Sequence, residues 1–165
     1  MDKTIYNKAA DRLRVLCSRR EYSSGDMLAK AAEYLARYGT DSQEVPDAAA
    51  SIVESLRRDG YVDDLRYASA FARDKALLSG WGRIKIRYAL AAKGLPEDTI
   101  AGALESVDPQ EADRKLEKLA LSKLKSFSGD PQWKLKLIRF LLSRGYSYDA
   151  VSRTVARMAH NAENG

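Results

Sequence analysis

Cysteine and histidine are nearly absent from this sequence, which contains one of each, Cys17 and His160. A lone cysteine cannot form an internal disulfide, and such sparse use of cysteine is typical of a reducing compartment. Neither residue belongs to a cluster with metal-ligand spacing, and no second histidine could serve as the base for a thiol nucleophile. We therefore expect no catalytic residues, no metal and no cofactor, and we expect that the protein is not an enzyme.

Long apolar runs are missing as well. The longest are a few residues, such as Phe140-Leu141-Leu142, so we expect no segment that spans a bilayer. The first residues, Met1 to Thr4, lack the basic-then-apolar form of a secretory signal. Together these absences predict a bacterial protein of the cytoplasm.

Two short motifs resemble functional sites but have simpler interpretations. Gly80-Trp81-Gly82 is rich in glycine, yet it lacks the Gly-Lys-Ser/Thr ending of a phosphate loop, which favours a turn between helices. Asp63-Asp64 could be a metal-binding acidic pair. A helical pattern starts directly after it, so an N-cap at one of these two residues is the favoured interpretation.

Charge is distributed unevenly along the 165 residues. The net charge is +5, and residues 111–165 carry 11 Lys/Arg against 6 Asp/Glu, whereas residues 1–110 are balanced. A basic last third favours binding to a polyanion such as nucleic acid, or to an acidic protein surface. Ordinary solvated helix surface is the alternative, and charge alone does not separate the two.

Helical spacing runs through almost the whole chain, while the alternating pattern of β-strands is nearly absent. Leu28, Ala31 and Leu35, for example, recur every three or four residues. Nine helices can be counted in this way. A sequence with this pattern predicts an all-α fold.

The nine helices form three similar groups. The segment Lys93-Gly94-Leu95 aligns with Arg144-Gly145-Tyr146 at an offset of 51 residues, and Tyr38-Gly39 aligns with the first of these at an offset of 55. Repetition of this kind predicts stacked units. We expect an elongated, right-handed-type superhelix of three tandem three-helix repeats. The repeats should cover residues 1–62, 63–107 and 108–160, with a disordered tail over 161–165.

The start and end of the helices in each repeat can be explained physically. Glycine ends the second helix, because left-handed backbone geometry costs it no Cβ strain. Pro46 and Pro96 are expected in the first turn of the third helix, where a missing N–H does no harm. In the last repeat, Ser147 is the expected N-cap.

Basic residues gather in the second and third repeats and are the candidate contacts to DNA or to a protein filament. Interleaved with them are Trp81 and Tyr88, for which we favour packing in the core over stacking on bases. A second group of lysines, Lys115 among them, flanks the set in the third repeat. If the cations share the concave side, they form one positive track. The candidate residues are Arg73, Lys75, Arg83, Lys85, Arg87, Lys93, Lys134, Lys136, Arg139 and Arg144.

The middle of the chain resembles the central signature of the RecX regulatory proteins. That signature has an aromatic residue and two acids, an arginine-aromatic-alanine, a basic helix, Gly-x-Gly, and Leu-x-x-Lys-Gly. Two positions depart from it: Ala89 replaces a frequent acid, and Arg83 replaces a frequent proline. The matching segments are 61–68, 71–75, 80–86 and 90–94, and residues 16–23 are similar to the motif of the family's first repeat.

The resemblance implies a monomeric regulator that lies in the groove of the RecA–DNA filament. It implies inhibition of strand exchange and of ATP hydrolysis by RecA in DNA repair, recombination and the SOS response. The implied partners are RecA and single- or double-stranded DNA, without strong sequence preference. Three alternatives stay open from the residues: a helical-repeat scaffold, a non-specific DNA-binding protein unrelated to RecA, and a helix-turn-helix repressor.

Overall fold

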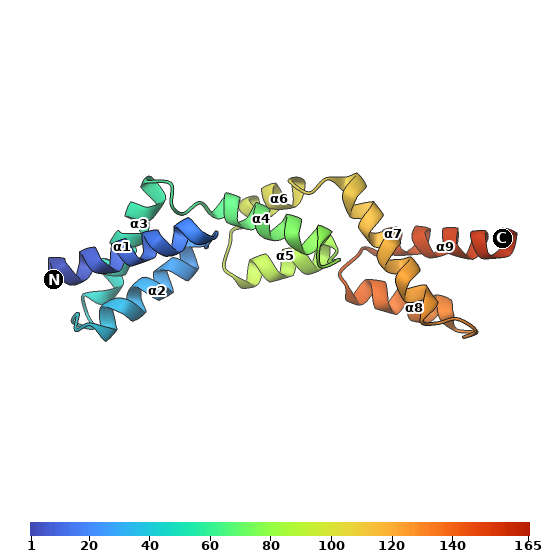
Figure 1. Cartoon of the computed structure of the whole chain (residues 1–165), viewed down its shortest axis with the longest axis horizontal. Coiled ribbons are helices and arrows are strands. Elements are labelled where there is room, and N and C mark those ends of the chain that lie inside the picture. Colours follow the sequence, from blue (N-terminus) through green and yellow to red (C-terminus); the bar gives the residue numbers. More distant parts are fainter.

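The computed structural model describes all of residues 1–165 and is entirely helical. Figure 1 shows three groups of helices placed side by side along one axis, with the two termini at opposite ends. The all-helical, elongated arrangement of three tandem three-helix repeats predicted from the sequence is thereby confirmed. The helices are α1 (Lys3–Arg19), α2 (Ser24–Arg37), α3 (Val45–Arg58), α4 (Asp64–Leu77), α5 (Arg83–Ala92), α6 (Glu97–Glu105), α7 (Pro109–Lys125), α8 (Trp133–Ser143) and α9 (Tyr148–Asn164).

Each group of three helices buries its own hydrophobic core. We refer to α1–α3, α4–α6 and α7–α9 as units 1, 2 and 3. Their cores lie within residues 9–62, 68–107 and 116–158, and no buried residue is shared between them. Separate cores support unit boundaries near residues 62 and 107, which stay a prediction. The chain thus behaves as a linear array in which each unit contacts only its neighbours.

Most of the helix starts and ends follow from local sequence. Asp63 is the N-cap of α4 and accepts a hydrogen bond from the Arg66 amide at 2.9 Å, and Ser147 caps α9 in the same way. The second helix of each unit ends at a glycine of positive φ, such as Gly94 at +81°. These predictions are confirmed. The acidic pair is therefore used at a helix start, as its favoured interpretation required.

Two predictions about helix boundaries are wrong. Pro96 does not enter the first turn of α6 but precedes it as the N-cap, because its ring also suits the extended backbone found there, with φ −71° and ψ 157°. Pro46 does lie in the first turn of α3. The residues after 160 are not a disordered tail. Helix α9 continues through them, and the side chain of Asn164 donates to the His160 carbonyl at 3.1 Å.

The two junctions between units differ in kind. Units 1 and 2 meet through side chains: the Asp64 carboxylate accepts from the amide and the hydroxyl of Ser24, and Arg66 pairs with Glu21 at 2.8 Å. Units 2 and 3 also meet through backbone. The first amides of α5 donate to carbonyls at the end of α8, and these two helices therefore follow one another end to end.

The bonds at this second junction satisfy groups that helix ends leave unpaired. The Gly82 amide donates to the Arg144 carbonyl at 2.8 Å, and the Ile84 amide donates to the Gly145 carbonyl at 3.1 Å. The positive end of the α5 dipole also faces the negative end of α8. Such contact requires two glycines, because a Cβ on Gly82 would overlap the backbone of Gly145. Units 2 and 3 are joined as one block.

Candidate nucleic-acid interface

The turn between α4 and α5 places a tryptophan at the junction of units 2 and 3. Gly80 adopts a φ of +67°, and the Trp81 amide then donates to the Lys75 carbonyl at 2.9 Å, which folds the turn back over the last turn of α4. The indole lies edge-on to the Phe71 ring, with centroids 6.3 Å apart. Trp81 is half-buried, in agreement with its predicted packing role. The motif is a helix–helix turn and fixes an aromatic platform.

Four cations converge around this turn. The ammonium groups of Lys75 and Lys85 each lie 4.6 Å from the centroid of the Trp81 ring. Beside Gly80, the Lys115 Cε and an Arg144 guanidinium nitrogen lie 3.4 and 3.7 Å from the position that a Cβ would occupy. We call Lys75, Lys85, Lys115 and Arg144 the junction cluster. The four residues come from helices of two units and are brought together only by the fold.

The four cations of the junction cluster are not paired with acids. None of its four residues takes part in an ion pair, although ten ion pairs link other charges of the chain. All four side chains are partly buried, so their charges are less screened by water than those of fully exposed lysines. Unpaired, close-set cations create a local positive potential that attracts phosphate groups. The aromatic face of Trp81 holds two of them in place.

Arg144 has a structural role that the sequence does not reveal. Its guanidinium donates to the Gly80 carbonyl at 3.2 Å and to the Ser79 carbonyl, and it thereby caps the turn that follows α4 from the neighbouring unit. A charged donor of this kind satisfies two carbonyl groups of that turn. Arg144 therefore stabilises the junction, and its charge contributes to the cluster from a fixed position.

Replacing this guanidinium is expected to weaken the junction. Arg144→Gln should lower the free energy of unfolding by about 2 kcal/mol, because carbonyl groups at a part-buried site lose a charged donor. Arg139→Gln is the matched control: its side chain is exposed on the same helix and makes no ion pair or hydrogen bond. The control should change stability by less than about 0.5 kcal/mol. Urea denaturation followed by circular dichroism measures both, and equal effects would contradict the capping role.

Among the remaining predicted contacts, three lie beside acids. Arg87 pairs with Glu97, Lys136 pairs with Asp130, and Lys93 lies 3.9 Å from Asp26. A hydrogen bond to Tyr67 also raises the pKa of the Lys93 ammonium, so this side chain already interacts with residues of the chain itself. Four cations are exposed and outside any ion pair, namely Arg73, Arg83, Lys134 and Arg139.

Tyr88 lies where the sequence does not predict it. Its side chain is 79% exposed, so the expected packing in the core is wrong. Within α5 the buried residues are Ile86 and Leu90, and a residue midway between them along the helix points to the opposite side. Lys115 shows the converse error, because sequence spacing alone gives no sign that it approaches the turn of unit 2.

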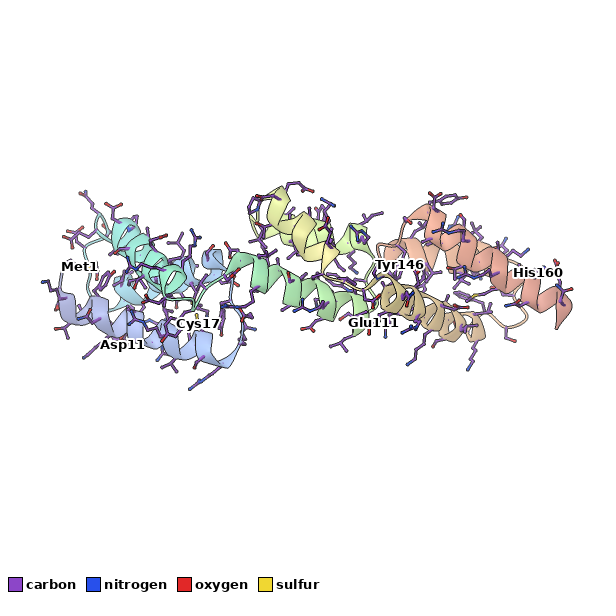
Figure 2. The ribbon with its side chains drawn as sticks, turned by 90° about the horizontal axis from the view of Figure 1, so that it is seen from above. Met1, Asp11, Cys17, Glu111, Tyr146 and His160 are labelled. Carbon is purple, nitrogen blue, oxygen red and sulfur yellow. The ribbon has the colours of Figure 1, made fainter.

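The single cysteine and histidine lie far apart. Figure 2 shows Cys17 in the first unit and His160 near the opposite end, with Tyr146 at the boundary between the middle and last units. Burial raises the pKa of the Cys17 thiol, and its Sγ contacts the Met27 Sδ at 3.5 Å.

No group of three or more His, Cys, Asp or Glu side chains is arranged to hold a metal ion. None of the nine helices combines the length and hydrophobicity needed to cross a membrane.

Two family models match the chain, and both describe RecX. The model of its second three-helix domain matches residues 63–104, and the model of its third three-helix domain matches residues 111–155. These ranges correspond to helices of units 2 and 3. The junction cluster takes Lys75 and Lys85 from the first matched region and Lys115 and Arg144 from the second.

Relatives of known name include several regulatory proteins RecX. The protein from Chromohalobacter salexigens is 34% identical over 154 residues, which cover 93% of this chain and 92% of the relative. That from Clostridium perfringens is 38% identical over 114 residues, which cover 66% of this chain and 52% of the relative. The chain thus spans about half the length of the clostridial relatives and nearly all of the shorter one.

Solved structures of the same name share the fold. The crystal structure of RecX from Lactobacillus salivarius superposes with a TM-score of 0.78 at 19% identity, covering 95% of this chain and 98% of the other. A second crystal structure of a regulatory protein RecX gives 0.74 at 24% identity, covering 90% and 70%. At these identities the likeness concerns the arrangement of the helices.

Proposed function

The chain belongs to the RecX family of regulatory proteins, and from that premise we propose that it binds the RecA filament on DNA and slows RecA. The proposed effects are reduced strand exchange and reduced ATP hydrolysis by RecA, in DNA repair, recombination and the SOS response. The chain would act as a monomer in the bacterial cytoplasm, by binding alone. Its relatives are named as regulatory proteins.

The observation that supports this proposal most is the junction cluster. Its four unpaired cations converge on one aromatic turn, and the junction beneath them is fixed by backbone hydrogen bonds. When a phosphate backbone binds to such a site, its counterions are released. The affinity gained in this way does not depend on the base sequence. Three similar units in a row suit tracking along a backbone better than the symmetric half-sites that a helix-turn-helix repressor reads.

The elongated shape supports a filament as the target. Three units in a row can contact successive protomers and the DNA between them, and several weak contacts then add to one strong attachment. Exposed cations on units 2 and 3, including Arg83, Lys134 and Arg139, extend the positive surface beyond the cluster. A compact protein of this size would reach fewer protomers.

Filament binding can be tested with a salt series. Fluorescent single-stranded DNA, bare or coated with RecA, is titrated with the chain at several salt concentrations, and anisotropy or sedimentation gives the affinity. We expect binding to the coated DNA with a steep loss of affinity as salt rises. Binding to bare DNA alone would instead indicate a DNA-binding protein unrelated to RecA, and binding to neither would leave a helical-repeat scaffold.

A further inference from the structure

Helix α5 is apolar on two opposite sides. Ile86 and Leu90 fill the core of unit 2, as expected for an amphipathic helix. On the outward side, Ile84 and Tyr88 lie one turn apart and are 59% and 79% exposed. A solvated helix face normally carries charged residues there. The outward face of α5, Ile84 and Tyr88, is therefore a surface without a partner in the chain.

Unit 3 shows this feature only in part, and unit 1 does not show it. In α8, exposed Leu135 stands at the position equivalent to Ile84, but the exposed cation Arg139 stands at the position equivalent to Tyr88, one turn before exposed Leu142. The exposed side of α2 instead carries an ion pair between Glu33 and Arg37. Among the second helices of the three units, α5 alone has apolar residues at both positions.

A cavity opens beside the outward face of α5. It has a volume of about 190 Å³ and lies between units 2 and 3, with walls from Trp81, Ile84, Leu116 and Ala150. A benzene molecule fits a cavity of about 150 Å³, and cofactor sites run from about 300 Å³ upward. The volume therefore suits one apolar side chain rather than a cofactor. We call this cavity the junction pocket.

The junction pocket contains an unpaired polar group. Tyr146 lines it and is 8% exposed, and its hydroxyl is buried without a hydrogen-bond partner. Burial raises the pKa of this phenol, so it remains a neutral donor. An unsatisfied buried hydroxyl is costly, and an acceptor that enters with a ligand offsets that cost. A backbone carbonyl next to an inserted side chain provides such an acceptor.

We propose that the junction pocket and the outward face of α5 bind the protein component of the filament, through an apolar side chain with acidic residues beside it. This inference rests on the proposed function. Arg83 and Asp113 both border the pocket, and Arg83 is exposed and makes no ion pair, so its guanidinium is free to meet a carboxylate. The pocket receives the anchoring side chain, and the partner surface beside that side chain covers Ile84 and, one turn further along α5, Tyr88.

A protein is the favoured occupant over nucleic acid for two reasons. Apolar Ile84 offers nothing to phosphate groups, whereas the four cations that do are gathered in the junction cluster nearby. Exposed Ile84 of α5 and exposed Leu135 of α8 occupy equivalent positions in successive units, which suits a partner that presents one surface repeatedly. A filament of identical protomers has that property.

The test uses substitutions that leave the net charge unchanged. The double variant Ile84→Ser/Tyr88→Ser should weaken binding to RecA-coated single-stranded DNA about tenfold, because truncated anchor contacts typically cost that much. Its binding to bare DNA should stay within about twofold, since no cation is removed. Leu28→Ser, an exposed leucine of unit 1, is the matched control and should bind the filament as the wild type does.

A second variant examines the pocket itself. Ala150→Leu fills part of the cavity from a half-buried position and should also reduce filament binding, with helical content retained in circular dichroism. If both variants bind RecA-coated DNA as tightly as the wild type does, the inference is overturned while the proposed function stays intact. Equal losses on bare DNA would assign the face to nucleic acid. A dimer in sedimentation that the double variant abolishes would assign it to self-association. Failure of the wild type to bind the filament would overturn both proposals.

Discussion

Gly145→Ala should lower the free energy of unfolding by about 4 kcal/mol. Two causes add. Gly145 has a φ of +91°, a conformation that costs an alanine about 1 kcal/mol. In addition, the new Cβ would lie 2.6 Å from the Lys85 amide nitrogen and would overlap the Lys85 Cβ. Backbone at the junction cannot move away, because it carries the bonds between α5 and α8.

The repeat supplies a matched control for this substitution. Gly94 holds the equivalent position in unit 2, with a φ of +81°, but a Cβ there would meet nothing within 4 Å. Gly94→Ala should therefore cost only the backbone strain, about 1 kcal/mol. Thermal and urea denaturation, with hydrogen exchange to locate the loosened helices, compares the two. Similar losses of stability at both positions would mean that the backbone at the junction of units 2 and 3 shifts to accommodate the new Cβ at little cost in free energy.

Neutralising the junction cluster should produce the largest loss of binding. The triple variant Lys75→Gln/Lys85→Gln/Lys115→Gln leaves the structural Arg144 in place and removes the three lysine charges around the Gly80-Trp81 turn. We expect affinity for single-stranded DNA, bare or RecA-coated, to fall about 30-fold or more at moderate salt. The slope of log affinity against log salt should flatten by about 2, since each lost phosphate contact on a single strand removes about 0.7.

Net charge is controlled by a second triple variant. Lys3→Gln/Lys8→Gln/Lys30→Gln removes the same number of charges from unit 1. If the junction cluster is the contact site, this control should change the salt slope far less. Matching losses in the two variants would show that overall charge, rather than the convergence of cations at the junction, governs binding.

The elements of the fold could be predicted because their signals are local. Periodic apolar residues, capping side chains such as Ser147, and glycines such as Gly94 each depend on a few neighbouring positions. The repeat was legible for the same reason, since equivalent residues recur at one offset. Local signals do not fix the exact residue at which a helix begins. Pro96 is accordingly the N-cap that precedes α6, whereas the sequence predicts it within the first turn.

The site could be predicted only in part because it depends on contacts between distant residues. Arg144 and Ser79 are 65 positions apart, and nothing in either local sequence shows that one caps the other. Basic residues on one helix also form ion pairs with acids on another, as Arg87 does with Glu97. Charge counts therefore identified the basic units, whereas the convergence of Lys75, Lys85 and Lys115 required the structure.

Exposure of Tyr88 illustrates a limit of reasoning from residue type. Aromatic residues are usually needed for packing, which favours the core as their place. The phase of α5 relative to Ile86 and Leu90 nevertheless directs Tyr88 outward. Helical phase was available in the sequence and carried the better signal in this case.

The central claim is that the chain restrains RecA by attaching to its filament through units 2 and 3. The most direct test is the rate of ATP hydrolysis by RecA on single-stranded DNA as the chain is added. The account predicts that the rate falls as the filament is occupied, and that the lysine triple variant requires a much higher concentration for the same fall. An unchanged rate at concentrations where the chain is seen bound to the filament would contradict it.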